Sequence, residues 1–322
     1  MRPKRWLDGD ALRANVAAFA ALGAPVAAVV KQDGYGWGAR LLARELDAVV
    51  ESYFVNDADE LAALRPATAK PVRLLSDVPG SRLGRVLDLG GIPNVSTLEA
   101  VAAAAAEAER RGPVTVRIGV HDAAGWSAIR RADAAAFAAV LAPTQLAVEL
   151  WTHLSSTSRA QELLDGLLAV RAGFEAAGVQ VVSTDVASTA SARRGLAFDR
   201  LRIGVGLFGS RLGASVDNRC AIRLVAPVVR HYPAGAMEWA GYGDRAAGGH
   251  PVAVLRCGYG DGFPKGMAGT ADILSVGMQY TARVSHGGER RVCLIGEVDD
   301  VDELAARAGI DPHELVVGLA WR

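Results

Sequence analysis

The sequence has few cysteines and no surplus of charge of either sign. Its three cysteines, Cys220, Cys257 and Cys293, are odd in number and widely spaced among 322 residues. This argues against a disulfide framework and against a CxxC metal site, so we expect no metal and a reducing, cytoplasmic location. Because 35 Lys and Arg balance 35 Asp and Glu, no net field would recruit nucleic acid or an anionic membrane surface.

Long hydrophobic runs are also missing. The chain contains no stretch of about 18 apolar residues, the length that a membrane helix needs. Residues 1–5 lead into Trp6 without the apolar core of a signal peptide. We therefore expect a soluble protein. Its apolar content of 51% and its length favour one large domain followed by a smaller one.

Short apolar, β-rich runs alternate with alanine-rich helical patterns through the first two thirds of the chain. The predicted strands are residues 26–31, 53–56, 72–76, 93–96, 114–120, 146–154, 179–185 and 201–207. Strands that alternate with helices indicate a parallel sheet. Eight such units fit an α/β fold of the (β/α)8 barrel type better than a doubly wound sheet.

The pattern changes after Gly213, where helical periodicity fades. Residues 221–229, 251–257, 272–276, 280–284 and 291–295 read as strands between glycine-rich turns. We predict a barrel domain over residues 1–215 and a mostly β domain over residues 216–322. The first few residues are expected to join the second domain.

Lys31 stands where the first apolar strand opens into a glycine-rich loop that contains Tyr35. Desolvating an ammonium there is costly unless its pKa falls or the amine is consumed in an imine, and lysines that form imines occupy such positions. The alternative is a lysine at a strand end whose side chain reaches water.

The ends of the last two barrel strands are suited to bind a phosphate. Ser188 and Thr189 follow the seventh strand, and the glycine-rich residues 204–209 follow the eighth. Their hydroxyls and closely approachable backbone amides can hold an anion. The same glycines fit a GxGxxG dinucleotide pattern, but they close the repeating units instead of opening the first one, and no acidic residue follows about 20 positions later. Alternatively, these glycines only allow the backbone to form a tight turn and bind no ligand.

An imine-forming lysine opposite a phosphate site suggests pyridoxal 5'-phosphate (PLP) as the cofactor. Arg202, on the eighth strand, is a candidate partner for the ring nitrogen. A guanidinium stays protonated, so it would keep that nitrogen unprotonated and favour reprotonation of the substrate over elimination. An ion pair in the barrel wall is the alternative role for this arginine.

These motifs together resemble the alanine racemase family of fold-type III PLP enzymes, over nearly the whole length. Residues 30–38 read VKQDGYGWG against the family's VKADAYGHG, residues 152–153 are TH, residues 202–204 are RIG, and residues 258–262 read GYGDG against GYADG. The resemblance implies that Lys31 forms the Schiff base and that Tyr35 and Ser188 hold the phosphate with Gly204 and Val205.

The resemblance also implies the remaining roles. His153 would pack against the cofactor ring, and Tyr259 would be the second acid/base, reaching the cofactor from the other subunit of a homodimer with shared active sites. The implied substrate is a small molecule of the amino-acid class, whose Cα proton would be exchanged between Lys31 on one face and Tyr259 on the other.

The chain departs from the family pattern at the contacts that hold the substrate carboxylate. In the family's KxDTGMxR after strand five, Arg117 here takes the place of the lysine. The arginine that ends the motif is missing, and its position falls near Ala124. The MD segment of the second domain is absent from a shortened loop, and Trp321 replaces a phosphate-binding tyrosine. We therefore predict a substrate other than free alanine, with Arg117, His121 and His286 as candidates to hold its carboxylate.

Several functions remain open from the sequence. A racemase or epimerase is favoured because both bases are present. A PLP enzyme of specialised metabolism that catalyses elimination or exchange comes next, since the carboxylate contacts are changed. Decarboxylation is less favoured because the catalytic cysteine motif of that related family is not evident. The last alternative is a non-catalytic PLP-binding protein.

Overall fold

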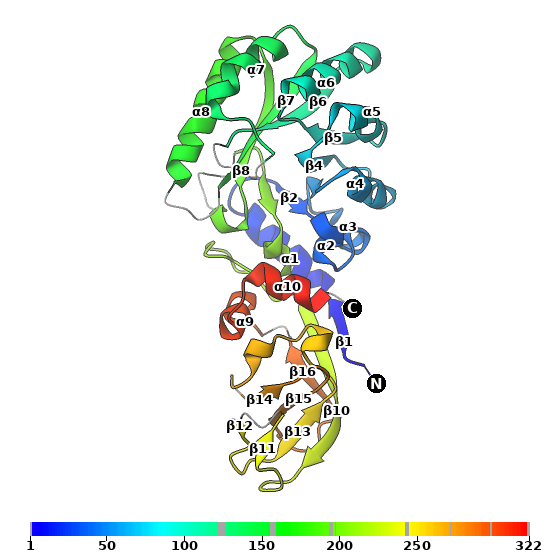
Figure 1. Ribbon diagram of the computed structural model, residues 1–322, viewed down its shortest axis with the longest axis vertical. Helices are drawn as coiled ribbons and strands as arrows, with labels where there is room; N and C mark the ends of the chain where they lie inside the picture. Colours follow the sequence, from blue (N-terminus) through cyan, green and yellow to red (C-terminus); the bar gives the residue numbers. More distant parts are fainter. Residues whose placement is uncertain are drawn as a thin grey trace.

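A computed structural model of the chain describes residues 2–121, 127–154, 159–192, 196, 198–241, 245–270, 272–296 and 298–320. The molecule is elongated, with a helix-covered parallel sheet at one end and an antiparallel sheet at the other (Figure 1). None of the helices in these ranges is both long and apolar enough to cross a bilayer.

The first part is the predicted eight-stranded parallel barrel. Its strands are β2 (Val26–Val29), β3 (Ser52–Val55), β4 (Val72–Asp77), β5 (Gly91–Asn94), β6 (Val114–Gly119), β7 (Leu146–Leu154), β8 (Gln180–Ala187) and β9 (Leu201–Ile203). They lie in the order β8-β7-β6-β5-β4-β3-β2-β9, and the backbone N–H of Asp199 donates to the Thr184 carbonyl at 3.2 Å where the two ends meet. The eight predicted strands are confirmed, although the last is shorter because residues 205–208 form a 3-10 helix.

Helices cover the outside of this barrel (Figure 1). They are α1 (Gly9–Ala20), α3 (Ala39–Leu46), α4 (Ala58–Leu64), α5 (Gly80–Asp88), α6 (Leu98–Arg111), α7 (Ala134–Leu141) and α8 (Ala160–Ala176). Asp8 caps α1 by accepting a hydrogen bond from the Ala11 N–H at 3.0 Å, which satisfies one of the orphan donors of the first turn. Leu12, Val16 and Phe19 of α1 are buried, as their spacing predicts.

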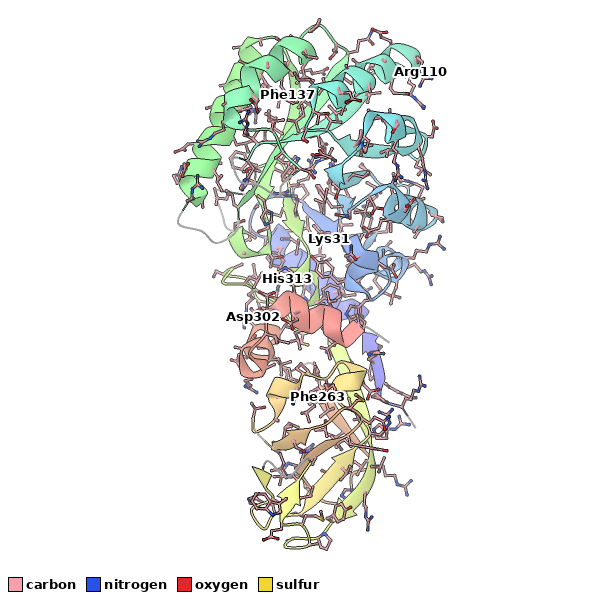
Figure 2. All side chains as sticks on the ribbon, viewed as in Figure 1. Lys31, Arg110, Phe137, Phe263, Asp302 and His313 are labelled. Carbon is pink, nitrogen blue, oxygen red and sulfur yellow. The ribbon has the colours of Figure 1, made fainter. Side chains whose placement is uncertain are left out.

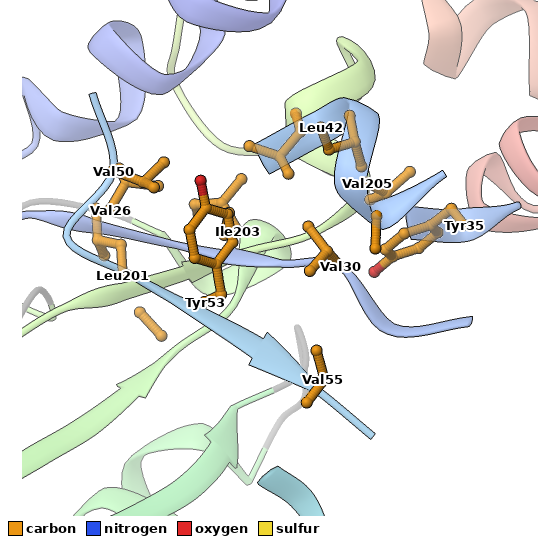
Figure 3. Packing of buried hydrophobic residues seen from close by; sticks show 14 of the residues in the cluster. Val26, Val30, Tyr35, Leu42, Val50, Tyr53, Val55, Leu201, Ile203 and Val205 are labelled. Carbon is orange, nitrogen blue, oxygen red and sulfur yellow. The ribbon is translucent and has the colours of Figure 1, made fainter. Parts of the chain in front are cut away.

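Buried apolar side chains fill the space between strands and helices near β2 (Figure 3). Val26, Val30 and Tyr53 are at most 1% exposed. Parallel strands are covered on both faces, so they read as continuous apolar runs in the sequence. This packing fixes the end of β2 at Val29, and with it the position of Lys31 two residues later.

The second part is an antiparallel sheet of the order β1-β10-β13-β15-β14, with β16 also paired to β10. Its strands are β1 (Lys4–Leu7), β10 (Ile222–Tyr232), β13 (Val252–Leu255), β14 (Ile273–Val276), β15 (Thr281–Val284) and β16 (Arg291–Ile295), beside a small hairpin of β11 (Trp239–Ala240) and β12 (Arg245–Ala246). The N-terminal β1 pairs with β10. The boundary after residue 215 stays a prediction.

Two helices that the sequence reading missed end the chain, α9 (Val301–Ala308) and α10 (Pro312–Ala320). They lie between the two parts of the molecule (Figure 1). On α9, Asp302 accepts hydrogen bonds from the backbone N–H groups of Arg211 at 2.8 Å and Leu212 at 3.2 Å, in the loop after β9. The Trp37 indole donates to the Val316 carbonyl of α10 at 3.0 Å. These contacts hold the C-terminal helices against the barrel.

Candidate active site

A cavity of about 620 Å³ lies at the C-terminal ends of the barrel strands. This is the face at which (β/α)8 enzymes carry their active sites, and the volume suits a cofactor or other small ligand. Its wall is formed by Val29, Lys31, Tyr35, Asn56, Leu75, Ser76, Ser127, Trp151, His153, Ser188, Thr189, Ala190, Arg202, Gly204, Val205, Leu212, Asp311 and His313.

Seven of the eight predicted site residues line this one cavity. They are Lys31, Tyr35, His153, Ser188, Arg202, Gly204 and Val205. The eighth, Tyr259, lines a different hollow beside α9 and α10. The resemblance in sequence implies that Tyr259 acts at the cofactor of another subunit.

The Lys31 turn has an unusual backbone. Residues 32–35 all have positive φ, at 54° for Gln32, 49° for Asp33, 65° for Gly34 and 59° for Tyr35. This left-handed conformation is costly for side-chain-bearing residues, and such strain gathers at functional sites. Asp33 offsets part of the cost by accepting a hydrogen bond from the Ala39 N–H at 2.8 Å, at the start of α3. The strand ends at Val29, two residues earlier than predicted, and Lys31 begins the short helix α2 (Lys31–Tyr35). Lys31 is exposed, so the expected desolvation of its amine is not found in the single chain.

Tyr35 lies over the backbone of Gly204. A Cβ added to Gly204 would lie 2.1 Å from the Tyr35 Oη, so a glycine is required for this close approach. Burial raises the pKa of Tyr35 well above its ordinary value, and its phenol therefore stays a neutral hydrogen-bond donor. Ser188 and Thr189 line the same cavity. This end of the cavity has the hydroxyls and close backbone that a phosphate needs.

Arg202 lies in a network of buried charges inside the barrel. Its Nε is 2.8 Å from Asp185 Oδ1, and its Nη2 donates to the Val186 carbonyl at 3.2 Å. Asp185 also faces Arg117 Nη2 at 3.0 Å and Arg200 Nη1 at 3.2 Å. Burial opposes the charge of Asp185, but the three arginines outweigh it and lower the pKa of its carboxyl. The ion pair in the barrel wall is therefore present. Arg202 also lines the cavity, and its role as the partner of the ring nitrogen stays a prediction.

The cavity has a positive field. Desolvation, together with the positive charges of Arg202 and Lys31, lowers the pKa of His153 to about 3, and His121 and His313 act in the same direction. His153 is therefore neutral at physiological pH. The positive charges that act on His153 also favour an anionic ligand in the cavity. Together with the Tyr35–Gly204 contact, this field fits a phosphorylated cofactor.

Tyr259 begins a short 3-10 helix, Tyr259–Asp261. The glycines that flank it are required by close contacts, since an added Cβ would lie 2.2 Å from the Gly277 carbonyl at Gly258 and 2.1 Å from the Gly318 carbonyl of α10 at Gly262. The Tyr259 side chain is 38% exposed. The GYGDG motif thus fixes an exposed tyrosine on the second domain, against α10.

The three candidates for holding a carboxylate have different positions. Arg117 is fully buried in the charge network and does not belong to the cavity wall, so that candidacy was wrong. His286 lies in the second domain at 2.9 Å from Asp272 Oδ2, also away from that wall. His121 acts electrostatically on His153, so it is close to the cavity. Ala124 and Trp321 lie outside the described residues.

Several cavity residues were not predicted from the sequence. Asn56 and Ser76, after β3 and within β4, bond each other at 2.9 Å, and the Trp151 indole donates to Asn94 Oδ1 at 2.7 Å. Asp311 and His313 reach the cavity from the start of α10. Polar residues at barrel strand ends could have been collected from the strand prediction alone, but the position of α10 could not.

Comparisons with known proteins agree with this architecture. Residues 7–212, more than half of the chain, match the family described as alanine racemase, N-terminal domain. The chain therefore belongs to the alanine racemase family. An alanine racemase from Acidiphilium cryptum (strain JF-5) is 26% identical over 351 aligned positions, which cover 99% of this chain and 97% of that protein.

Solved structures share the whole fold. The alanine racemase from D-cycloserine-producing Streptomyces lavendulae superposes with a TM-score of 0.83 at 22% identity, over 99% of this chain and 95% of that one. An alanine racemase from Bartonella henselae with covalently bound pyridoxal phosphate gives a TM-score of 0.80 at 18% identity, over 99% and 97%. The barrel followed by the antiparallel domain is thus the alanine racemase fold.

Proposed function

We propose that this protein is a PLP-dependent amino-acid racemase or epimerase whose physiological substrate is not free alanine. The observation that carries the proposal is the convergence of seven predicted cofactor residues, from Lys31 to Val205, on one cavity. They come from segments far apart in the chain, and structural requirements alone give no reason for them to meet around an exposed lysine.

Each residue has a role that its position supports. Tyr35, Ser188, Gly204 and Val205 hold the phosphate, and the neutral His153 packs beside the ring. Arg202, fixed by Asp185, is the partner of the ring nitrogen. When bound, PLP withdraws electrons from the amino acid attached to it and makes the Cα proton removable. The Lys31 amine takes or returns that proton on one face of Cα.

The second base in this proposal is Tyr259 of a partner subunit. Tyr259 is exposed and lies outside the cavity of its own chain. Met278 is 55% exposed and Tyr280 is 47% exposed, and the Met278 carbonyl accepts from the Gly260 N–H at 2.8 Å. Exposed apolar side chains grouped around a functional tyrosine suit a protein interface. A homodimer would complete each cavity with this surface.

The substrate proposal rests on the part of the cavity wall that lies outside the proposed phosphate-binding residues. Asn56, Leu75, Ser76 and Ser127 are neutral, and the arginine that the family uses for the carboxylate has no counterpart in the sequence near Ala124. Losing a charge-assisted contact costs about 1.5 to 3 kcal/mol of binding. We therefore propose a larger or modified amino acid, whose other polar groups contribute to binding.

Hydrogen exchange at Cα tests the function. The PLP-loaded protein is incubated in heavy water with a panel of L- and D-amino acids, and the products are separated by chirality and weighed by mass spectrometry. Deuterium at Cα with inversion is expected for the physiological substrate, and alanine should exchange more slowly than that substrate.

Other results would select other functions. Exchange with retained configuration, or loss of a β substituent, would support elimination or exchange in place of racemisation. Bound cofactor with no Cα exchange on any member of a broad panel would contradict an enzymatic role and favour a PLP-binding protein.

A further inference from the structure

Two neutral polar side chains in the cavity wall have no role in the proposed proton transfer. Asn56 follows β3 and Ser76 lies within β4, and both line the cavity. Because β3 and β4 pair in parallel, their C-terminal ends meet at the face of the barrel that carries the site. Figure 2 shows Lys31 on the side of the barrel that is nearer to His313 and α10. The pair therefore belongs to the wall of the same cavity as Lys31.

One carboxylate links Asn56 to the turn that bears Lys31. Glu60 accepts a hydrogen bond from the backbone N–H of Gln32 and another from the backbone N–H of Asn56, each at 2.7 Å. Gln32 directly follows Lys31, the proposed base. The backbones of Asn56 and of the Lys31 turn are therefore held in a fixed relation to each other by a single side chain.

The Asn56 amide is oriented by Ser76. The Ser76 hydroxyl donates to Asn56 Oδ1 at 2.9 Å, and the Ser76 backbone N–H donates to the Asn56 carbonyl at 3.0 Å. Among the described residues, none accepts from Asn56 Nδ2 and none donates to Ser76 Oγ. The pair thus offers the cavity one donor, Nδ2–H, and one acceptor, Ser76 Oγ. Turning the amide over would still leave one donor and one acceptor.

This part of the wall is neutral, which restricts what it can bind. Where the structure describes the cavity wall, β3, β4 and the residue after β3 contribute only Asn56, Leu75 and Ser76. A carboxylate has acceptors only and an ammonium has donors only, so each leaves one group of the pair unmatched and loses water without gaining an opposite charge. An aliphatic group leaves both members of the pair unpaired. A neutral group with a donor and an acceptor matches both.

We propose that Asn56 and Ser76 are specificity-determining residues that bind a hydroxyl or carboxamide group on the side chain of the substrate. This inference rests on the proposed function and narrows its substrate to amino acids with a neutral, hydrogen-bonding side chain. Asn56 Nδ2 donates to the oxygen of this group, and the O–H or N–H of the group donates to Ser76 Oγ. Such a site rejects an analogue that lacks the group, because its own polar atoms are then left unpaired.

Pairs of amino acids of similar shape test this preference. PLP-loaded protein is incubated in heavy water with threonine against valine, asparagine against leucine, and asparagine against aspartate, and kcat/KM is measured from deuterium at Cα. Dissociation constants are measured separately from the change in cofactor absorbance. The neutral polar amino acid should exceed its partner at least about tenfold in both measurements. Threonine shows this preference if the site binds a hydroxyl, and asparagine shows it if the site binds a carboxamide.

Two variants assign the preference to the pair. Asn56→Leu removes the donor and should bring the polar-to-apolar ratio to within about threefold of one, whereas Ser76→Ala removes the acceptor and should lower the ratio at least about threefold. The ratio within a pair cancels any general loss of activity or of folded protein. Ser81→Ala, at an exposed serine of α5, is the matched control and should keep the wild-type ratio.

Each outcome bears on a different claim. Equal kcat/KM and equal affinity within every pair would overturn the inference while leaving the racemase proposal intact. So would a preference for aspartate, or a wild-type ratio that survives in both Asn56→Leu and Ser76→Ala. A protein that binds PLP but exchanges the Cα hydrogen of no amino acid tested would instead contradict the proposed function.

Discussion

The protonation states of His153 and Arg202 depend on burial and on the charges around them. His153 is surrounded by Arg202, Lys31, His121 and His313, and its imidazole stays neutral as a result. Arg202 is balanced by Asp185 inside the barrel, yet burial still lowers its pKa to about 10. It therefore remains charged at neutral pH. The cavity combines a neutral histidine with a permanently charged arginine, as the proposed ring contacts require.

The low pKa of His153 makes the apoprotein acid-sensitive. Desolvation lowers that pKa from 6.5 to about 3, so between these values the unfolded chain binds a proton that the folded chain does not. Stability is therefore lost as pH falls through this window. We expect the free energy of unfolding of the apoprotein to include a loss of about 2 kcal/mol from His153 between about pH 7 and pH 5.

Urea unfolding at the two pH values measures this loss. His153→Gln should remove it, so the difference between the two pH values should be smaller by about that amount than in wild type. His250→Gln is the control and should keep the full difference. An unchanged difference in His153→Gln would show that His153 is protonated in the folded protein.

Among the elements, the barrel strands were the easiest to predict and the C-terminal helices the hardest. Strands buried on both faces leave continuous apolar runs, and all eight were found. The helix α9 was missed although Asp300 caps it and Gly309 ends it in the left-handed region, which are ordinary helix signals. These helix signals were not recognised because the last hundred residues were interpreted as β strands and turns.

The composition of the site was only partly predictable for a related reason. Lys31, Ser188 and Arg202 follow from strand ends in a barrel. His313 does not, because its place depends on contacts such as that between Trp37 and Val316, which are 279 positions apart. Local sequence patterns predict helices and strands, but the packing of α10 against the barrel depends on the whole fold.

A substitution in the turn after β9 tests the proposed phosphate-binding end of the cavity. Gly204 has φ −112°, which alanine also adopts, so the cost of Gly204→Ala comes from its clash with Tyr35. Displacing Tyr35 should weaken PLP binding at least about tenfold. Gly173→Ala on α8, where nothing lies within 4 Å of an added Cβ, should leave affinity unchanged and stabilise the helix by about 0.5 to 1 kcal/mol. Equal affinities of the two variants, measured by titration, would contradict the proposed phosphate end.

In the whole molecule, the two proposed bases lie on different parts. Lys31 belongs to the barrel, whereas Tyr259 belongs to the antiparallel domain and faces away from the cavity wall of its own chain. Tyr259 lines a hollow together with residues of α9 and α10, the helices that lie between the two parts of the molecule (Figure 1). The proposed two-base mechanism therefore predicts a homodimer in which a second copy of the chain supplies Tyr259.

Complementation between inactive variants tests this arrangement. Lys31→Ala and Tyr259→Phe should each be inactive in racemisation, but co-expressed in equal amounts they should form hybrid dimers with one intact site. The mixture should recover about a quarter of the wild-type rate, because about half of the dimers are hybrids with one working site of two. The rate is measured by chiral separation on the substrate identified by Cα exchange. A mixture as inactive as its components would contradict a shared site.

The most direct test of the account is to find which amine holds the cofactor. The chain has four lysines, Lys4, Lys31, Lys70 and Lys265. Of these, all within the described residues, Lys31 lines the barrel cavity. The PLP-loaded protein is reduced with borohydride, digested and mapped by mass spectrometry. We predict a pyridoxyl-phosphate adduct on the peptide that contains Lys31 and on no other. An adduct on another lysine, or none on a protein that binds PLP, would contradict the account.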